Sequence, residues 1–357
     1  YEGTFRPKES GAYELLIEGD DGYRVYVNGE KVIDYWGEHA SAKREYTLKA
    51  IAGTDYKIRI EYMQAGAEAL LRFDLGVYRH ISPEMVVDRV KEADIVIFAG
   101  GISPSLEGEE MYSVNSPGFA GGDRTSIELP QVQRDILKAL KKAGKKVVFV
   151  NSSGSAVALV PEMESCDAIL QAWYPGQAGG LAVADVLFGD FNPSGKLPVT
   201  FYKNTDQLPD FEDYSMKNRT YRYMTEVPLF PFGYGLSYTT FDISKGRLNK
   251  KTISAGQDLN FKVNVKNTGK YDGAEVIQVY VRKVDDAEGP IKSLRAFRRV
   301  PLKAGETCVV SIDLLPTTFE FFDPTTNTMR IMPGKYEIMY GNSSDIPSGN
   351  KLSVTLR

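Results

Sequence analysis

The stretch from Asp94 to Gly101 reads DIVIFAGG, an unbroken apolar run that ends in two glycines. A short run of this composition is typical of a strand buried on both faces. An amphipathic segment over residues 130–143 precedes a second run, Lys146 to Val150, and a third run covers residues 167–172. Because buried strands that alternate with helices pair in parallel through right-handed crossovers, residues 80–241 are predicted to form a doubly wound α/β sandwich domain.

The segments on either side of this domain are predicted to be β-structure. Residues 1–79 alternate apolar and polar positions, and Asn28-Gly29 between two such strands is a strong signal for a tight hairpin. Residues 242–357 carry short strands at regular spacing, which predicts an immunoglobulin-like sandwich. The expected fold class is therefore multidomain, with a partial β-sandwich module, an α/β domain with a parallel sheet, and a C-terminal β-sandwich.

Composition narrows the class of protein. The 357 residues include 43 Lys and Arg against 47 Asp and Glu, and this balance gives no support to a nucleic-acid partner. No run of about 18 apolar residues occurs, so no membrane-spanning helix is expected. Two cysteines are too few for a disulfide framework, and by themselves too few for a zinc site. Because the chain begins at Tyr1 rather than Met, we expect a fragment or a processed piece.

Ligands of open parallel sheets bind beyond the carboxyl ends of the strands, and this rule selects three loops. The first loop runs from Gly100 to Pro130, and a connection of about 30 residues is uncommon unless it is functional or disordered. Its charged residues include Glu107, Glu109, Glu110, Asp123 and Arg124. Carboxylates beside an arginine suit general acid–base chemistry. A solvated acidic loop is the alternative on composition alone.

The other two loops begin at Asn151 and at Trp173. The NSSG sequence at 151–154 resembles a phosphate-binding turn but lacks both nucleotide-binding glycine patterns, which disfavours a nucleotide site. An indole such as that of Trp173 either stacks on a sugar or packs within the protein, and both interpretations stay open. A Ser-His-Asp hydrolase is disfavoured because His39 and His80 lie outside the α/β core and no G-x-S-x-G elbow occurs.

Several motifs then match one known family in order. They are LEGE at 106–109 followed by GDRT at 122–125, WYPGQAGG at 173–180, NPSGKLPVTF at 192–201 and FPFGYGLSYT at 230–239. On these motifs the chain resembles glycoside hydrolase family 3, the β-glucosidase and β-xylosidase family. Residues 242–357 resemble the fibronectin type III-like domain that ends many members. DDGYRVYVNG at 20–29, with Trp36, resembles the anthrax-protective-antigen-like (PA14-like) β module that some members carry as an insertion.

The resemblance implies the C-terminal part of a retaining, exo-acting β-glycosidase, with β-glucosidase ahead of β-xylosidase. Such enzymes use two carboxyl groups roughly 5–5.5 Å apart. In the family the nucleophile is an aspartate on an N-terminal barrel, which this sequence lacks, so the chain is expected to supply the acid/base. Glu107 is the candidate and Glu109 the runner-up, followed by Glu110. Asp123 and Arg124 are expected to support the loop.

The resemblance also implies partners and a location. Trp36 and Trp173 are candidate substrate contacts, with core packing as the alternative for Trp36. The expected partners are a β-linked oligosaccharide or aryl glycoside and the barrel portion of the same enzyme, either on the same chain or on a separate one. No nucleic acid, membrane, metal or cofactor is implied, and a secreted or periplasmic location follows from the substrate class. The alternative hypothesis is a non-catalytic carbohydrate-binding or scaffolding fragment.

Overall fold

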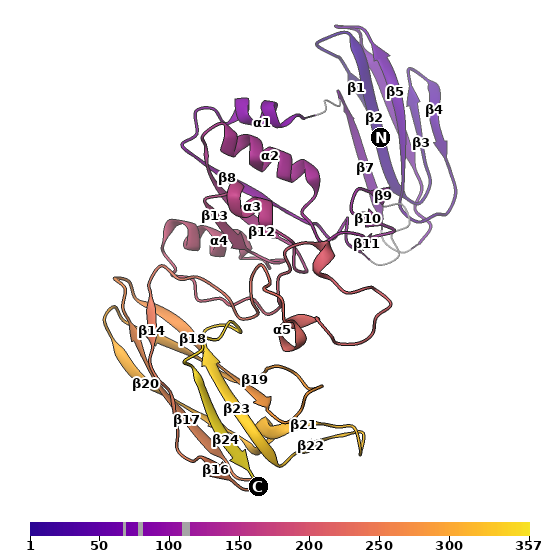
Figure 1. The fold of residues 1–357 in the computed structure, drawn as a ribbon. Helices are drawn as coiled ribbons and strands as arrows, with labels where there is room; N and C mark the ends of the chain where they lie inside the picture. Colours follow the sequence, from indigo (N-terminus) through magenta and orange to yellow (C-terminus); the bar gives the residue numbers. More distant parts are fainter. Residues whose placement is uncertain (67–68, 78–80, 109–114) are drawn as a thin grey trace. The chain divides into compact units, whose positions relative to one another are not determined.

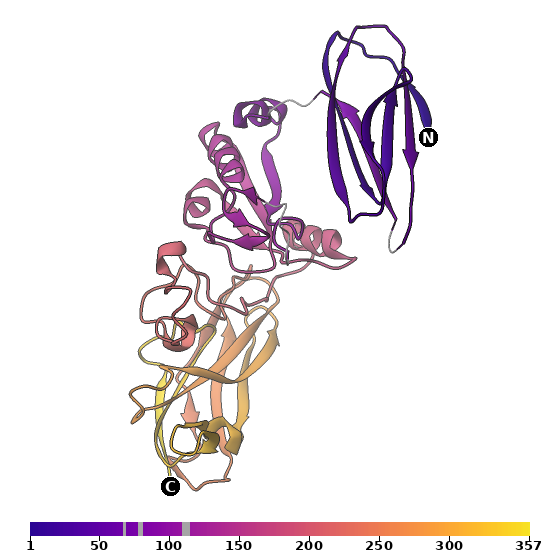
Figure 2. The same ribbon diagram turned by 90° about the vertical axis from the view of Figure 1, so that its right-hand side faces the viewer.

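The computed structural model describes residues 1–66, 69–77, 81–108 and 115–357. The chain forms two compact units, Tyr1–Ser82 and Pro83–Arg357, each with its own packing. Strands predominate in both units, and the helices gather in the first part of the second unit (Figures 1 and 2). No helix in the described ranges is both long enough and apolar enough to cross a membrane.

The first unit consists of two antiparallel sheets that share one core. One sheet has the order β1 (Glu2–Phe5), β6 (Tyr56–Tyr62), β3 (Tyr23–Val27) and β4 (Glu30–Tyr35), and the other has β5 (Ala42–Ala50), β2 (Gly11–Asp20) and β7 (Leu70–Gly76). Leu15 and Ile17 of the second sheet pack with Val25 of the first. The hairpin predicted at Asn28-Gly29 is confirmed, because both residues have positive φ and join β3 to β4.

The second unit begins with a three-stranded parallel sheet in the order β13 (Ala168–Gln171), β12 (Lys146–Ser152) and β8 (Ile95–Gly101). The helices are α1 (Pro83–Arg89), α2 (Gln131–Lys142), α3 (Val160–Ser165) and α4 (Gly179–Phe188). Leu137 and Leu140 on the apolar face of α2 are fully buried with Val147 and Phe149 of β12. The predicted alternation of parallel strands and helices is confirmed.

The two faces of this sheet differ in burial. Val96 and Phe98 of β8 face the core under α2, whereas Ile95 and Ile97 are 56% and 52% exposed. The prediction that this strand is buried on both faces is therefore wrong for the residues that the structure describes. The apolar run specifies a strand, but the run itself carries no information about what covers its second face.

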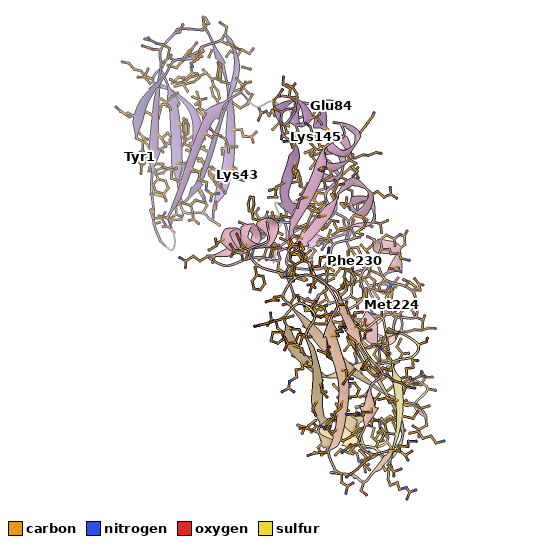
Figure 3. The ribbon with its side chains drawn as sticks, turned by 90° about the vertical axis from the view of Figure 1, so that its left-hand side faces the viewer. Tyr1, Lys43, Glu84, Lys145, Met224 and Phe230 are labelled. Atoms are coloured by element: carbon orange, nitrogen blue, oxygen red, sulfur yellow. The ribbon has the colours of Figure 1, made fainter. Side chains whose placement is uncertain are left out.

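Residues 201–241 form an extension with little regular structure. It contains the short helices η1 (Thr205–Gln207) and α5 (Thr220–Tyr223). Aromatic rings hold it together: Phe230, labelled in Figure 3, stacks on Tyr234 at 5.2 Å and meets Phe201 edge-on at 6.1 Å. Met224, labelled in the same view, is buried.

The chain ends in a two-sheet sandwich. One sheet contains β14 (Phe241–Ile243), β17 (Leu259–Asn267), β15 (Arg247–Leu248) and β20 (Thr307–Leu314), and the other has the order β16 (Thr252–Ile253), β24 (Lys351–Leu356), β23 (Gly334–Gly341), β18 (Gly273–Lys283) and β19 (Ser293–Leu302). A 3₁₀ turn, η2 (Pro316–Phe319), leads into the hairpin β21 (Glu320–Asp323) and β22 (Thr328–Ile331). An ion pair between half-buried Lys196 and buried Glu275, with Nζ 2.7 Å from Oε1, joins the sandwich to the preceding part of its unit.

Candidate active site

Three side chains from three loops meet beyond the carboxyl ends of the parallel strands. Glu107 comes from the loop after β8, Ser155 from the loop after β12 and Tyr174 from the loop after β13. Ser155 Oγ donates a hydrogen bond to Glu107 Oε1 at 3.0 Å, and the Tyr174 hydroxyl lies 3.4 Å from Glu107 Oε2. Parallel strands end at a common edge, and this brings together residues that are far apart in the sequence.

Arg124 contacts both Glu107 and Ser155 and holds them in position. It ends the short strand β11 (Asp123–Arg124), which pairs with β10 (Phe119–Ala120), itself paired with β9 (Asn115–Ser116). Its Nη1 donates to Ser155 Oγ at 2.8 Å and lies 3.7 Å from Glu107 Oε1. The Arg124 side chain is 10% exposed. Burial lowers the pKa of Arg124, and the negative charge of Glu107 opposes that effect.

Arg124 and Ser155 form a chain of donors that ends on the carboxylate. The guanidinium donates to Ser155 Oγ, so the serine hydroxyl proton is directed to Glu107 Oε1. Arg124 also donates to the carbonyl of Ala156 at 3.1 Å and, through Nε, to that of Ser126 at 3.2 Å. These backbone contacts fix the guanidinium, and the guanidinium in turn orients Ser155 and Glu107.

Tyr174 contacts the other carboxylate oxygen of Glu107. Its hydroxyl donates to the carbonyl of Ile102 at 2.8 Å, so its single proton serves either that carbonyl or Glu107 Oε2. Burial raises the pKa of Tyr174, and the charge of Glu107 raises it further. The ring lies against Gly154, where a Cβ would be 2.7 Å from a ring carbon. Glycine at this position allows the close approach.

Buried polar side chains under the cluster hold the strand ends in place. Asn151 Nδ2 donates to Gln171 Oε1 at 2.6 Å, and Gln171 Nε2 donates to Ser153 Oγ at 3.2 Å. Ser153 Oγ donates in turn to the carbonyl of Ser155 at 2.9 Å. Asn151 and Ser153 are fully buried. The 151–154 turn thus directs these two side chains inward, toward the strands, where they position Ser155.

A cleft of about 320 Å³ lies beside Ser155. Its lining residues come from four segments of the chain: Gly154, Ser155, Ala156, Trp173, Val199, Thr200, Tyr202 and Thr220. Trp173 has a φ of 58°, which is uncommon for a bulky residue, and its ring meets Phe201 edge-on at 6.1 Å. The indole packs on Phe201 and also lines the cleft, and stacking of a sugar on it stays a prediction.

The remaining predicted residues fall in different places. Asp123 is exposed and lies opposite Ala120 in the small sheet. Trp36 belongs to the first unit, where it is 43% exposed with the Arg24 guanidinium 4.3 Å from its ring centre. The core-packing alternative for Trp36 is therefore wrong, because an exposed indole under a cation is not part of the core.

Four further residues complete the comparison with the sequence. Glu109, Glu110 and His80 lie outside the described residues. His39 packs against Tyr35 at 4.2 Å and Tyr23 at 5.9 Å between ring centres. Sequence reasoning missed Ser155 as a partner of Glu107, because Ser155 lies one residue beyond the 151–154 turn that the rule for strand ends selects.

Comparisons with known proteins give matches over the whole chain. Residues 21–238 match the model of the glycosyl hydrolase family 3 C-terminal domain, and residues 275–344 match that of a fibronectin type III-like domain. All of the chain aligns at 52% identity with a xylan 1,4-beta-xylosidase of Xylanibacter ruminicola and covers 41% of that protein. A periplasmic beta-glucosidase of Salmonella typhimurium is 38% identical over 74% of the chain, which covers 35% of that relative.

Solved structures give the same result at the level of the fold. The beta-glucosidase of Kluyveromyces marxianus in complex with glucose superposes with a TM-score of 0.78 at 28% identity, over 100% of this chain and 44% of that one. The beta-glucosidase of Listeria innocua in complex with isofagomine gives 0.65 at 31% identity, over 78% of this chain and 39% of that one. The chain thus spans less than half the length of these relatives.

Proposed function

The chain belongs to glycoside hydrolase family 3, and we propose that it supplies the general acid/base, Glu107, of a retaining, exo-acting β-glycosidase. The observation that carries this proposal is the hydrogen-bonded setting of Glu107 at the carboxyl edge of the sheet. The nucleophile is an aspartate on a barrel outside this sequence, and that barrel portion is the partner of the chain.

The contacts of Glu107 give its two carboxylate oxygens different roles in proton transfer. Oε1 accepts the Ser155 hydrogen bond and faces Arg124, whereas Oε2 has the longer 3.4 Å contact with Tyr174. Oε2 is therefore the atom available to hold a proton and pass it to the glycosidic oxygen. In the second step the same oxygen takes a proton from the attacking water. The Glu107 side chain is 24% exposed, so a substrate can reach it.

We propose a β-linked xyloside as the substrate, ahead of the glucoside expected from the sequence. The relative that aligns with all of the chain at 52% identity is named for xylan 1,4-beta-xylosidase activity. The periplasmic relative named for β-glucosidase activity shares less, with 38% identity over 74% of the chain. Discrimination rests on one hydroxymethyl group, a difference of about 1–3 kcal/mol in most pockets, so activity on both sugars is expected.

Two further proposals concern the first unit and the location. Residues 1–79 are proposed to be a partial PA14-like module, with Trp36 as a contact for a distal sugar; the two-sheet fold and the exposed indole support this. Asp123 and Arg124 are proposed to support the acid/base loop. An extracytoplasmic location is proposed from the relative named as periplasmic and from the polymeric origin of the substrate.

The test uses the enzyme that contains this chain together with its barrel portion. Glu107→Gln is compared with wild type on aryl β-xylosides whose leaving groups differ in acidity, with exposed Glu164→Gln as the matched control. We expect kcat/KM to fall about 10²- to 10⁴-fold for poor leaving groups and much less for nitrophenol, because only poor leaving groups need the proton. Glu109→Gln is run in parallel. A larger loss in that variant moves the assignment to Glu109, and full activity of Glu107→Gln refutes the role.

A further inference from the structure

A second cluster of polar side chains lies where the 201–241 extension meets the sandwich. Arg222 belongs to α5 in the extension, and Arg295 belongs to β19 in the sandwich. Two hydrogen bonds join these segments: Ile291 N donates to the carbonyl of Arg222 at 2.8 Å, and Leu294 N donates to the Tyr221 hydroxyl at 3.1 Å. These side chains have no part in the network around Glu107.

Three buried atoms of this cluster lack a hydrogen-bond partner among the described residues. They are Nε of Arg222, Nε of Arg295 and Oγ of Ser293. Ser293 is 5% exposed, and both arginines are partly exposed through other atoms of their side chains. Buried polar atoms are nearly always paired, so three unpaired ones on neighbouring segments call for an explanation.

The two guanidinium groups also lack a carboxylate at ion-pair distance in the described part of the chain, although the negative charge of Glu320 acts on Arg295 from farther away. Neither arginine forms an ion pair with any carboxylate in the described ranges; Arg295 Nη2 instead donates to the carbonyl of Glu320 at 2.6 Å. Burial lowers the pKa of Arg295, and the positive charge of Arg222 lowers it further. Arginine stays charged in proteins, so the repulsion between the two groups persists.

The backbone holds Arg295 in a fixed position. Val279 pairs with Ala296 and Tyr280 pairs with Leu294, which leaves Arg295 as the extra residue of a β-bulge. Bulges re-aim a side chain and occur often beside functional sites. The guanidinium also lies 4.8 Å from the ring centre of Phe321, which limits its movement.

We infer that Arg222, Arg295 and Ser293 form a binding site for a small oxyanion or carboxylate taken from solution. A carboxylate, sulfate or phosphate accepts two guanidinium N–H bonds at once, and a serine hydroxyl supplies a further donor. Such an anion satisfies the three unpaired atoms and neutralises the charge that the two arginines share. The site is separate from the glycosidase chemistry and ties the extension to the sandwich.

Sulfate binding to the full chain tests this inference. Sulfate is titrated against chloride at constant ionic strength, and the melting of the Pro83–Arg357 unit is followed for the wild type, Arg295→Gln and Ser293→Ala. Arg298→Gln is the control, because Arg298 lies on the same strand but is exposed and donates to the carbonyl of Ser311. We expect a saturable rise in Tm, half complete on the order of 1 mM, in the wild type and the control. It should disappear in Arg295→Gln and weaken in Ser293→Ala.

General stabilisation by sulfate does not mimic this result, because it grows without saturation and acts on every variant alike. Equilibrium dialysis with labelled sulfate measures the occupancy of the site directly. The Arg222→Lys variant keeps the positive charge but removes the planar guanidinium group. Acetate in place of sulfate shows whether a carboxylate suffices. The inference is overturned if the wild type binds no sulfate saturably at millimolar concentration, or if Arg295→Gln and Arg222→Lys both bind it as the wild type does.

Discussion

Glu128 anchors the extension to the α/β part of its unit, and its charge is predicted to stabilise the fold. Thr205 donates to Glu128 twice, from its backbone N–H to Oε1 at 2.9 Å and from Oγ1 to Oε2 at 2.6 Å. Ser126 Oγ donates a further hydrogen bond to Oε2. Burial by itself would raise the pKa of Glu128, but the hydrogen bonds from Ser126 and Thr205 outweigh it and lower the pKa from 4.5 to about 2.

This pKa sets both the size and the pH range of the effect. A fall in the pKa from 4.5 to about 2 corresponds to about 3 kcal/mol of unfolding free energy, because each pKa unit is equivalent to about 1.36 kcal/mol. Because the folded pKa lies below the unfolded one, the stabilisation is fully present above about pH 5. It is lost as the pH falls toward 2, with about 1.4 kcal/mol left at pH 3 and under 1 kcal/mol at pH 2.

Glu128→Gln removes the charge and keeps the shape of the side chain. We expect the variant to lose about 3 kcal/mol of unfolding free energy at pH 7 and about 1 kcal/mol at pH 3, measured by urea unfolding of the Pro83–Arg357 unit. Exposed Glu92→Gln is the control and should differ from wild type by less than about 0.5 kcal/mol at either pH. A loss for Glu128→Gln that is equal at pH 7 and pH 3 would show that the carboxylate charge is not the source of the stability.

Gly101→Ala should destabilise the second unit by at least about 3 kcal/mol in urea unfolding, because φ is 121° and the new Cβ would lie 1.9 Å from the Ser152 carbonyl oxygen. Gly180→Ala, where a Cβ meets nothing within 4 Å, is its control, and equal stability of the two variants would contradict the steric argument. The Cys166 thiol should resist iodoacetamide in the native protein at pH 8, because burial raises its pKa to about 12. Mass spectrometry of the modified peptides checks this, and rapid native labelling of Cys166 would refute it.

The extent to which the candidate site follows from the sequence differs between its residues. Glu107 and Arg124 lie 17 positions apart in the sequence and belong to motifs that resemble one family, so the sequence alone names both as candidates. Ser155 lies 48 residues from Glu107 and Tyr174 lies 67 residues away. No local pattern marks Ser155 as a partner of Glu107. Only the order of the parallel strands shows that the loops meet.

The two faces of β8 illustrate the same limit. The apolar run predicts a strand but does not show which of its side chains face the core. Only the packing of α2 on one side of the sheet decides that Val96 and Phe98 face inward. The cluster of Arg222 and Arg295 is even harder to predict from the sequence. Its two segments lie far apart in the chain, and the hydrogen bond between Leu294 and Tyr221 spans 73 residues. Neither arginine has a sequence feature that sets it apart from other surface arginines.

By itself, therefore, the sequence determined the kinds of elements, their order along the chain, the family motifs and the candidate acid/base. The tertiary structure alone decided which oxygen of Glu107 is held, which strand face is exposed, and which arginines share a site. The physical reason is one of range. Backbone propensity and periodic burial act between neighbours in the sequence. Hydrogen bonds and charge interactions act between neighbours in space, and the crossovers of the sheet decide which residues those are.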